Sequence, residues 1–232
     1  MNQGILESAA RVVSRTDTLR MLCVKESPAL INSAVDEVNA AYWTLKKAIE
    51  LSSVTDGYVV ACHSDPAVKA IGEATGKPVV GIGFASLSAA AKYAGPSAIL
   101  AISEQSIPRK EALAKRYGFE GRFDTFATGY TEEMTGSDVF ECLSRAISLA
   151  RQKKAYSSFV LGCAGMGSVA PRLRKQLGLV IIDGTEEAVL SMKPGIYSPV
   201  IKKKEYIFQN GRKSFPHSEN SRGETSCKKR VQ

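Results

Sequence analysis

Two segments of the sequence, 101 residues apart, share one pattern: a short apolar run, then a cysteine, then residues suited to the start of a helix. In the first segment Gly-Tyr-Val-Val-Ala leads to Cys62, and in the second Ser-Phe-Val-Leu-Gly leads to Cys163. The longest helical patterns keep the same offset, because an apolar stripe at helical spacing runs through residues 38–49 and returns at 139–150. Order, length and phase agree together, so we interpret the chain as an internal duplication.

Apolar runs with strand character alternate with helical patterns along the chain, which indicates βα units around parallel sheets. We expect strands near residues 18–24, 57–61, 78–82, 97–102, 122–127, 157–162 and 179–182. We expect helices near residues 3–14, 31–51, 66–75, 84–94, 106–117, 137–154, 167–177 and 184–192. Both cysteines then follow a parallel strand at its carboxyl end, where α/β folds bind their ligands.

The duplication also predicts that the first half lacks a strand. The second half opens with the apolar run 97–102, and its counterpart would lie before Met1. A parallel sheet without that strand has unpaired backbone groups and an uncovered apolar face. We therefore expect the first half to be N-terminally incomplete and the chain to be a truncated or mis-started version of a longer protein.

The net charge of +8 is concentrated at the C-terminus. Residues 201–232 hold nine Lys and Arg against three Glu, which leaves a charge of only +2 for residues 1–200. The core therefore offers no case for a nucleic-acid face. The basic segment 201–232 lacks apolar periodicity, and we predict a disordered, solvated tail there, with a weak polyanion contact as the sharper alternative.

No apolar run approaches the ~20 residues needed to span a bilayer, and the first residues do not begin a secretory signal. We expect a cytoplasmic protein without a membrane contact. Its five cysteines should then be reduced thiols rather than a disulfide framework. With two histidines and no CxxC or HExxH pattern, a metal site is not expected.

The residues after each cysteine suit an anion. Unpaired N–H groups at a helix N-terminus lower the pKa of a thiol. After Cys62 the sequence offers Asp65 as an N-cap and Pro66 as the first helical residue. After Cys163, Ala-Gly-Met-Gly lets the backbone approach a ligand closely. If both thiols face one cleft, one thiolate can remove a proton from carbon and the other thiol can return a proton to the opposite face.

A structural interpretation competes with this one, because free cysteine is commonly a small buried hydrophobe. We interpret Cys142, on a helix stripe, and Cys23, in a strand, in this way, and Cys227 in the tail as incidental. For Cys62 and Cys163 the residues alone leave the catalytic and structural interpretations about equally supported.

Three further features of the sequence are each open to two interpretations. His63 is either a substrate-site residue or a polar loop residue, and we favour a substrate neighbour over a proton carrier because Ala164 stands at the equivalent position. The Gly-Ile-Gly run ending at Gly83 suits a ligand-facing turn and a hinge into the next helix equally well. Asp183 is expected to cap the following helix rather than to bind a ligand.

Three segments, in order, resemble the aspartate/glutamate/hydantoin racemase superfamily. They read Ala-Cys-His-Ser-Asp-Pro at 61–66, Pro-Val-Val-Gly-Ile-Gly at 78–83 and Leu-Gly-Cys-Ala-Gly-Met at 161–166. The third is similar to the hydantoin and allantoin racemase branch, and the resemblance covers roughly residues 1–195. The chain departs from the branch in the missing first strand, which ordinarily ends in Asn-Pro-Asn, and in Phe84, where many relatives carry Glu.

The resemblance implies an α/β fold of two similar parallel-sheet domains related by pseudo-twofold symmetry, with the active site in the cleft between them. Residues 1–95 would form the first half, joined by a C-terminal helix at 184–200. Residues 96–183 would form the second half.

The resemblance further implies a cofactor-independent racemase in which Cys62 and Cys163 are the acid/base pair. Its small-molecule substrate would be a five-membered cyclic ureide, hydantoin or allantoin, deprotonated at C5, with backbone groups beside each cysteine holding the carbonyl oxygens. A homo-oligomer is compatible with this function. The predicted substrate-binding residues are His63, Ser64, Gly83, Ala164 and Gly165.

Two other functions fit the same scaffold. One is a related decarboxylase or cis–trans isomerase, although a matched cysteine pair argues mildly against it. The other is an inactive paralogue that serves as a binding or regulatory protein.

Overall fold

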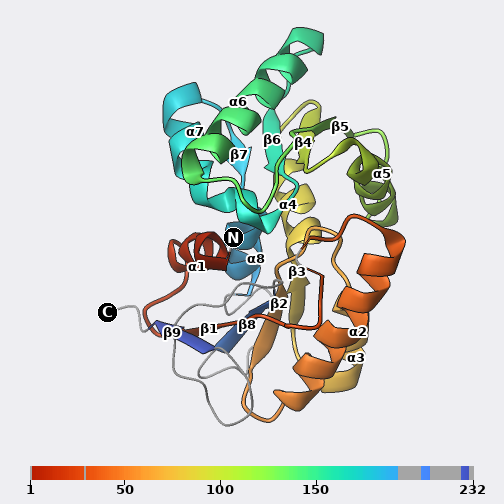
Figure 1. Cartoon of the computed structure of the whole chain (residues 1–232), viewed down its shortest axis with the longest axis vertical. Coiled ribbons are helices and arrows are strands. Elements are labelled where there is room, and N and C mark those ends of the chain that lie inside the picture. The colour runs from red at the N-terminus through yellow and green to blue at the C-terminus, as the bar shows by residue number, and fades with distance from the viewer. Residues whose placement is uncertain (1, 29, 193–204, 210–225, 230–232) are drawn as a thin grey trace.

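The computed structural model of the chain describes residues 2–28, 30–192, 205–209 and 226–229 (Figure 1). Two β-sheets lie one above the other in this view, and helices surround both of them. The strands are β1 (Thr18–Leu22), β2 (Gly57–Val60), β3 (Val79–Gly81), β4 (Ser97–Ala101), β5 (Phe123–Ala127), β6 (Ser158–Leu161), β7 (Ile181–Ile182), β8 (Glu205–Gln209) and β9 (Ser226–Lys229).

The helices follow the predicted periodicity closely. They are α1 (Asn2–Ala10), α2 (Ala34–Glu50), α3 (Val68–Thr75), α4 (Ile82–Ala90), α5 (Ile107–Arg116), α6 (Gly136–Lys153), α7 (Ala170–Leu177) and α8 (Gly184–Ser191), with 3₁₀ helices η1 (Glu104–Ser106) and η2 (Ala164–Val169). The predicted mixed α/β class with parallel sheets is therefore confirmed. Among the described residues, no helix is long and apolar enough to span a membrane.

The strand orders of the two sheets match. One sheet has the order β5-β4-β6-β7, with every pairing parallel. The other has the order β3-β2-β8-β1-β9, in which only β9 runs antiparallel to its neighbour. Strand β2 begins at Gly57 and β6 begins 101 residues later at Ser158, which is the spacing of the sequence repeat. Under this repeat, β8 takes the place in the first sheet that β4 has in the second.

The expectation of a disordered tail is wrong for two short segments. Residues 205–209 pair in parallel with both β1 and β2, and residues 226–229 pair with β1. The backbone N–H and C=O groups on the facing edges of β1 and β2 would otherwise lack partners, and an aromatic-rich Tyr-Ile-Phe run suits a strand at that position. Residues 201–204, 210–225 and 230–232 lie outside the described part of the chain.

The apolar stripes of the two longest helices are not buried alike. On α6, Val139, Leu143 and Ala146 are buried in the core. On α2, Val38 and Tyr42 are more than half exposed, although they occupy repeat positions of Val139 and Leu143. The sequence repeat thus preserves the pattern of α2 without preserving its burial.

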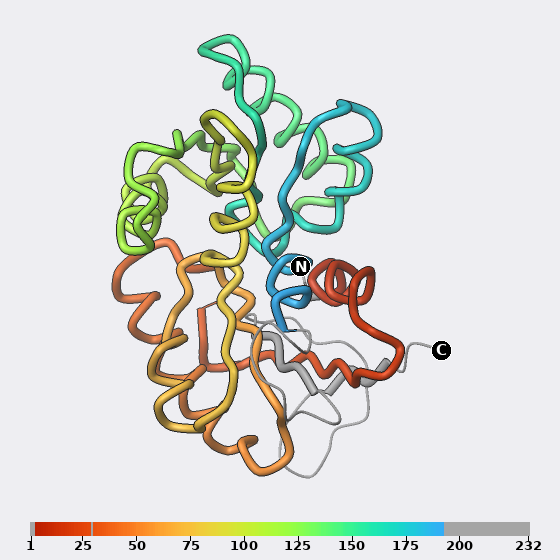
Figure 2. The backbone as a smooth tube through the Cα atoms, turned by 180° about the vertical axis from the view of Figure 1, so that it is seen from behind, coloured from red at the N-terminus to blue at the C-terminus, as the bar shows by residue number. Residues whose placement is uncertain are grey.

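Helices α4 and α8 each follow a strand of one sheet and pack on the other sheet. Helix α4 follows β3 of the first sheet, yet its Leu87 and Ala90 pack against Ile99 and Val160 of the second sheet. Helix α8 follows β7 of the second sheet and crosses the other way, with Ala188 among the core residues of the first sheet. The backbone tube in Figure 2 shows α4 rising between the sheets beside α8. This crossing ties the sheets together through apolar cores on both sides.

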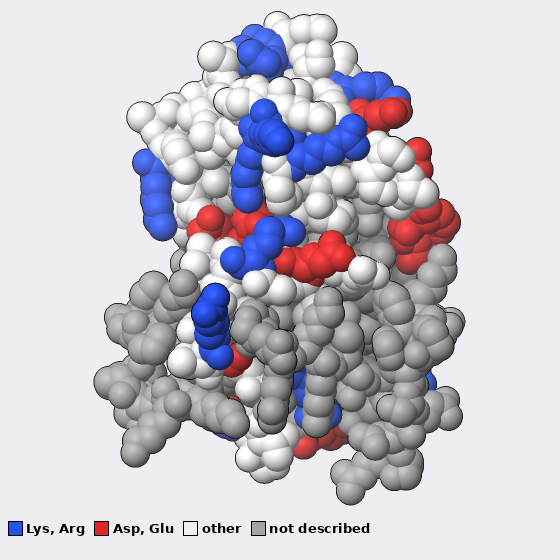
Figure 3. All heavy atoms as spheres, turned by 90° about the vertical axis from the view of Figure 1, so that its left-hand side faces the viewer, with Lys and Arg blue, Asp and Glu red and all other residues white. Residues whose placement is uncertain are grey.

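Ion pairs reinforce the junction. Arg11, just after α1, donates to Asp183 at 3.1 Å and to Glu186 at 2.6 Å, and its guanidinium also donates to the carbonyl of Gly167 in η2. Arg174 completes the cluster with a 2.6 Å ion pair to Glu186. On the face drawn in Figure 3, basic and acidic side chains are interspersed over the described surface rather than separated by sign.

The close approach of α4 and α8 depends on a missing side chain at Gly184. A Cβ there would lie 2.5 Å from the Ile82 carbonyl oxygen, which is backbone and cannot rotate away. We expect Gly184→Ala to lower the free energy of unfolding by about 1–3 kcal/mol through overpacking. Urea denaturation measures this change.

Gly136→Ala is the matched control, because Gly136 is also the first residue of its helix and no atom lies within 4 Å of the added Cβ. Equal unfolding free energies for both variants would contradict the proposed clash.

Candidate active site

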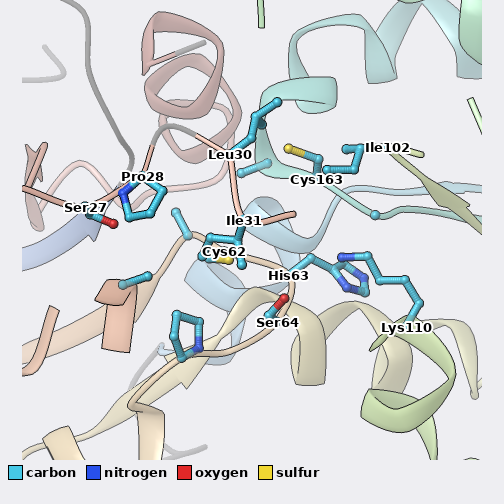
Figure 4. Close-up of a pocket in the computed structure, with 15 residues that line it drawn as sticks. Ser27, Pro28, Leu30, Ile31, Cys62, His63, Ser64, Ile102, Lys110 and Cys163 are labelled. Carbon is cyan, nitrogen blue, oxygen red and sulfur yellow. The ribbon is translucent and has the colours of Figure 1, made fainter. Parts of the chain in front are cut away.

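The carboxyl ends of β2 and β6 bring Cys62 and Cys163 to one pocket. Cys62 follows β2 after Ala61, and Cys163 follows β6 after Gly162, so each half contributes its thiol from the same topological position. Figure 4 shows both sulfurs beside this pocket. Its lining residues are Ser27, Pro28, Leu30, Ile31, Ala40, Ala61, Cys62, His63, Ser64, Pro66, Ile102, Lys110, Gly162, Cys163 and Ala164.

Each thiol meets the amide of the residue two positions further on. The Ser64 N–H donates to Cys62, and the Gly165 N–H donates to Cys163, so the repeat preserves the contact as well as the cysteine. Both amides stabilise the thiolate and act to lower the pKa of the thiol beside them.

The net direction is nevertheless the opposite of the lowered pKa that the sequence predicts. Both cysteines are half-buried, and loss of water around the sulfur raises the pKa of Cys163 and raises that of Cys62 to about 11. The Cys163 thiolate and the Asp65 carboxylate raise the pKa of Cys62 further. At neutral pH both thiols of the ligand-free site are therefore protonated, because burial outweighs the single amide that each thiol receives.

His63 is buried and neutral. Its Nε2 lies 3.2 Å from the Ser86 hydroxyl, which itself donates to the Gly83 carbonyl at 2.9 Å. Because the hydroxyl proton is engaged, we infer that the neutral imidazole carries its proton on Nε2 and a lone pair on Nδ1. That Nδ1 has no hydrogen-bond partner, and burial together with the charge of Lys110 holds the pKa of His63 well below its usual range.

Asp65 does not cap the helix that follows it. The N-cap of α3 is Ala67, and α3 starts at Val68, so Pro66 is not its first residue. The Asp65 carboxylate instead accepts the N–H groups of Gly83 and Phe84 at 2.8 and 2.7 Å, in the first turn of α4. Two amides and the Tyr117 hydroxyl at 2.8 Å are better partners than one amide of its own helix could be. Asp65 thereby ties the loop after Cys62 to α4.

The predicted substrate-binding residues do not all line the pocket. His63, Ser64 and Ala164 line the pocket with the two cysteines. Gly165 contributes its amide to Cys163. Gly83 is not a lining residue: it lies in α4, where an added Cβ would sit 2.7 Å from the His63 carbonyl oxygen. Its role in the structure is close packing of α4 on the cysteine loop.

The remaining predictions about cysteine and aspartate agree with the structure in two cases. Cys142 is buried in the core beneath α6, and Asp183 is the N-cap of α8, where it accepts the Thr185 N–H at 2.9 Å. Cys23 packs partly buried against the first-sheet core. Cys227 falls in β9, and its side chain lies outside the described part. Within the described residues, no group of three or more His, Cys, Asp or Glu side chains could hold a metal ion.

Sequence reasoning missed Lys110. This residue is only 7% exposed and lines the pocket from α5. The available signal was its position, because Lys110 precedes the buried Leu113 and Ala114 by three and four residues and so shares their apolar face. A lysine on such a face is unusual, since lysine is rarely fully buried without a partner.

Comparison with known proteins identifies racemases as relatives of this chain. Residues 1–192 match the family model for Asp/Glu/Hydantoin racemase. The chain is 32% identical over 197 residues to a hydantoin racemase of Pseudomonas sp. (strain NS671), across 82% of this chain and 78% of that protein. It is 27% identical over 194 residues to a hydantoin racemase of Paenarthrobacter aurescens, across 81% of this chain and 82% of that one.

Solved structures agree. The fold superposes on allantoin racemase from Klebsiella pneumoniae with a TM-score of 0.71 and 25% identity, over 82% of this chain and 79% of that chain. These similarities define an enzyme of the isomerase class, a racemase. The chain belongs to the aspartate/glutamate/hydantoin racemase family.

Burial of neutral His63 makes the stability of the protein depend on pH. The unfolded state takes up a proton on this imidazole below its ordinary pKa, and the folded state does not, so stability is unaffected at high pH and is lost as pH falls. We expect the unfolding free energy of the wild type, relative to His63→Gln, to drop by about 1 kcal/mol between pH 6.5 and 5.5.

Chemical denaturation of both proteins at several pH values measures this difference. His217 is common to both chains, so its titration cancels in the comparison. A pH-independent difference between the two proteins would show that His63 is not buried in neutral form.

Proposed function

We propose that the protein racemises a five-membered cyclic ureide of the hydantoin or allantoin type, without a cofactor, by proton transfer at C5 through Cys62 and Cys163. The observation that carries the proposal is that two thiols, one from each half, line one pocket. Each thiol accepts a hydrogen bond from the backbone N–H of the residue two positions later in the chain. The relatives described above are hydantoin and allantoin racemases.

The steps balance with one proton on the cysteine pair, so one of the two thiols first loses its proton to solvent. A thiolate on one side takes the C5 proton, so an S–H bond forms as the C–H bond breaks. The thiol on the other side then gives its proton to the opposite face of the planar carbon. The product has the inverted configuration, and the proton now resides on the first cysteine, ready for the reverse direction.

Between the two steps, negative charge moves onto the carbonyl oxygens that flank C5. Of the backbone N–H groups at 63–64 and 164–165, those of His63 and Ala164 are the proposed donors to these oxygens, because the N–H groups of Ser64 and Gly165 donate to the thiols. The adjacent carbonyls already acidify the C5–H bond, so the reaction needs no electron sink from a cofactor.

The lining of the pocket favours an uncharged ring over a zwitterionic amino acid. Leu30, Ile31 and Ile102 are apolar, and His63 is neutral. Lys110, which also lines the pocket, would repel a substrate ammonium group. The buried Asp65 carboxylate is occupied by two amides and a hydroxyl, so it is not available to bind a substrate ammonium group. A neutral ureide avoids the cost of burying unpaired substrate charges.

The test is loss of optical activity, or deuterium exchange at C5, in a panel of single-enantiomer hydantoins and allantoin. We expect Cys62→Ser and Cys163→Ser each to lower kcat by about 10²–10⁴-fold, because a serine hydroxyl is a far weaker acid than a thiol. Cys23→Ser is the control, since Cys23 is not a lining residue, and it should keep its activity.

Full racemisation by either single variant would rule out the two-thiol mechanism. Release of carbon dioxide from a malonate-like substrate would favour a decarboxylase, a function found on this fold in arylmalonate decarboxylase at a TM-score of 0.54 and 13% identity. Thermal stabilisation by the ureides without turnover would favour an inactive binding protein.

A further inference from the structure

Lys110 is a buried cation inside the proposed active site. It is 7% exposed, and Figure 4 shows its side chain reaching from α5 toward the His63 ring at the edge of the pocket. An ammonium group removed from water is costly unless it is compensated by charge or hydrogen bonds. An anion in or near this pocket would therefore stabilise the charged form of Lys110.

No carboxylate fills that role. Within the described part of the chain, Lys110 forms no ion pair at salt-bridge distance. Asp65 is close enough to interact, but its oxygens already accept from Gly83, Phe84 and Tyr117. The neighbouring Arg109 carries a like charge, which lowers the pKa of Lys110 further.

Lys110 lines the same pocket as Cys62 and Cys163, so either sulfur, once it has lost its proton, is an anion placed to compensate the ammonium group. After burial, which lowers the pKa of Lys110, the largest influences on its pKa are Cys62 and Cys163, and both of them raise it. The effect is reciprocal, because Lys110 lowers the pKa of each thiol. The titratable or charged groups that interact with Lys110 are Cys62, Cys163, His63, Asp65 and Arg109.

We propose that Lys110 is the shared cation of the two-thiol site, stabilising the thiolate of whichever cysteine has lost its proton. The proposal rests on the racemase function proposed above and adds a positioning residue to it. Lys110 takes no part in the proton transfer itself and keeps its proton throughout.

Racemisation in both directions favours a cation that acts on both cysteines. Each cysteine must serve as the base in one direction of the reaction and as the acid in the other. A cation that interacted with one thiol alone would favour one direction of proton transfer, whereas Lys110 interacts with both. Burial, together with the same charge, lowers the pKa of His63, so the imidazole does not compete for the proton.

The thiol pKa values can be measured without any substrate. Iodoacetamide alkylates the thiolate, with formation of an S–C bond and loss of iodide, and peptide mass spectrometry resolves Cys62 from Cys163. Over pH 7–10 we expect Lys110→Met to slow alkylation at both positions by about tenfold, which corresponds to about one pKa unit. Cys23 serves as an internal reference, because it is only partly buried and does not line the pocket.

Lys115→Met is the matched control on the same helix. Lys115 is exposed and pairs with Glu120 at the surface, so its removal should leave both alkylation profiles unchanged. Lys110→Met should fold at least as well as the wild type, because it replaces a buried charge by an apolar side chain of similar length. Lys110→Gln provides a second uncharged variant, and Lys110→Arg should restore the wild-type profile in part.

Wild-type alkylation profiles in both uncharged variants would overturn the inference. A shift at only one cysteine would also overturn it, because the cation would then not be shared. In racemisation assays, Lys110→Met should move the acidic limb of kcat/KM upward by about one pH unit. If the wild type racemises no ureide, the proposed function fails, while the alkylation result still decides whether Lys110 acts on the thiols.

Discussion

The packing of α4 against α8 is the constraint on which the rest of the structure depends. Each helix leaves the sheet of its own half and packs on the other, so the carboxyl ends of β2 and β6 are held toward one pocket. Gly184 permits this approach, and the Arg11 ion pairs reinforce it. Proton transfer to opposite faces of one carbon requires a defined separation between donor and acceptor, and the packing at this junction constrains that separation.

Burial sets the electrostatics of the pocket. The thiols, His63 and Lys110 are all shifted toward their uncharged forms, because removal of water penalises every isolated charge. The amides of Ser64 and Gly165 and the proposed role of Lys110 offset this cost for the thiolate alone. The thiolate therefore receives partial compensation, although the net pKa of both thiols remains raised.

The loop after Cys62 shows how positioning and charge are linked. Asp65 fixes the loop by accepting the first amides of α4, and Gly83 lets the His63 carbonyl pack against that helix. Because α4 also belongs to the core of the second sheet, the thiol of one half is braced by a helix that packs on the other.

The sequence by itself determined the order of helices and strands, the repeat, and the pair Cys62 and Cys163, since periodicity and spacing are local properties of the chain. Only the tertiary structure decided four things: the partner of Asp65, the burial of Lys110, the raised pKa of both thiols, and the place of β8 between β1 and β2. Each of these depends on which distant segments pack together and exclude water, and no short-range pattern encodes that.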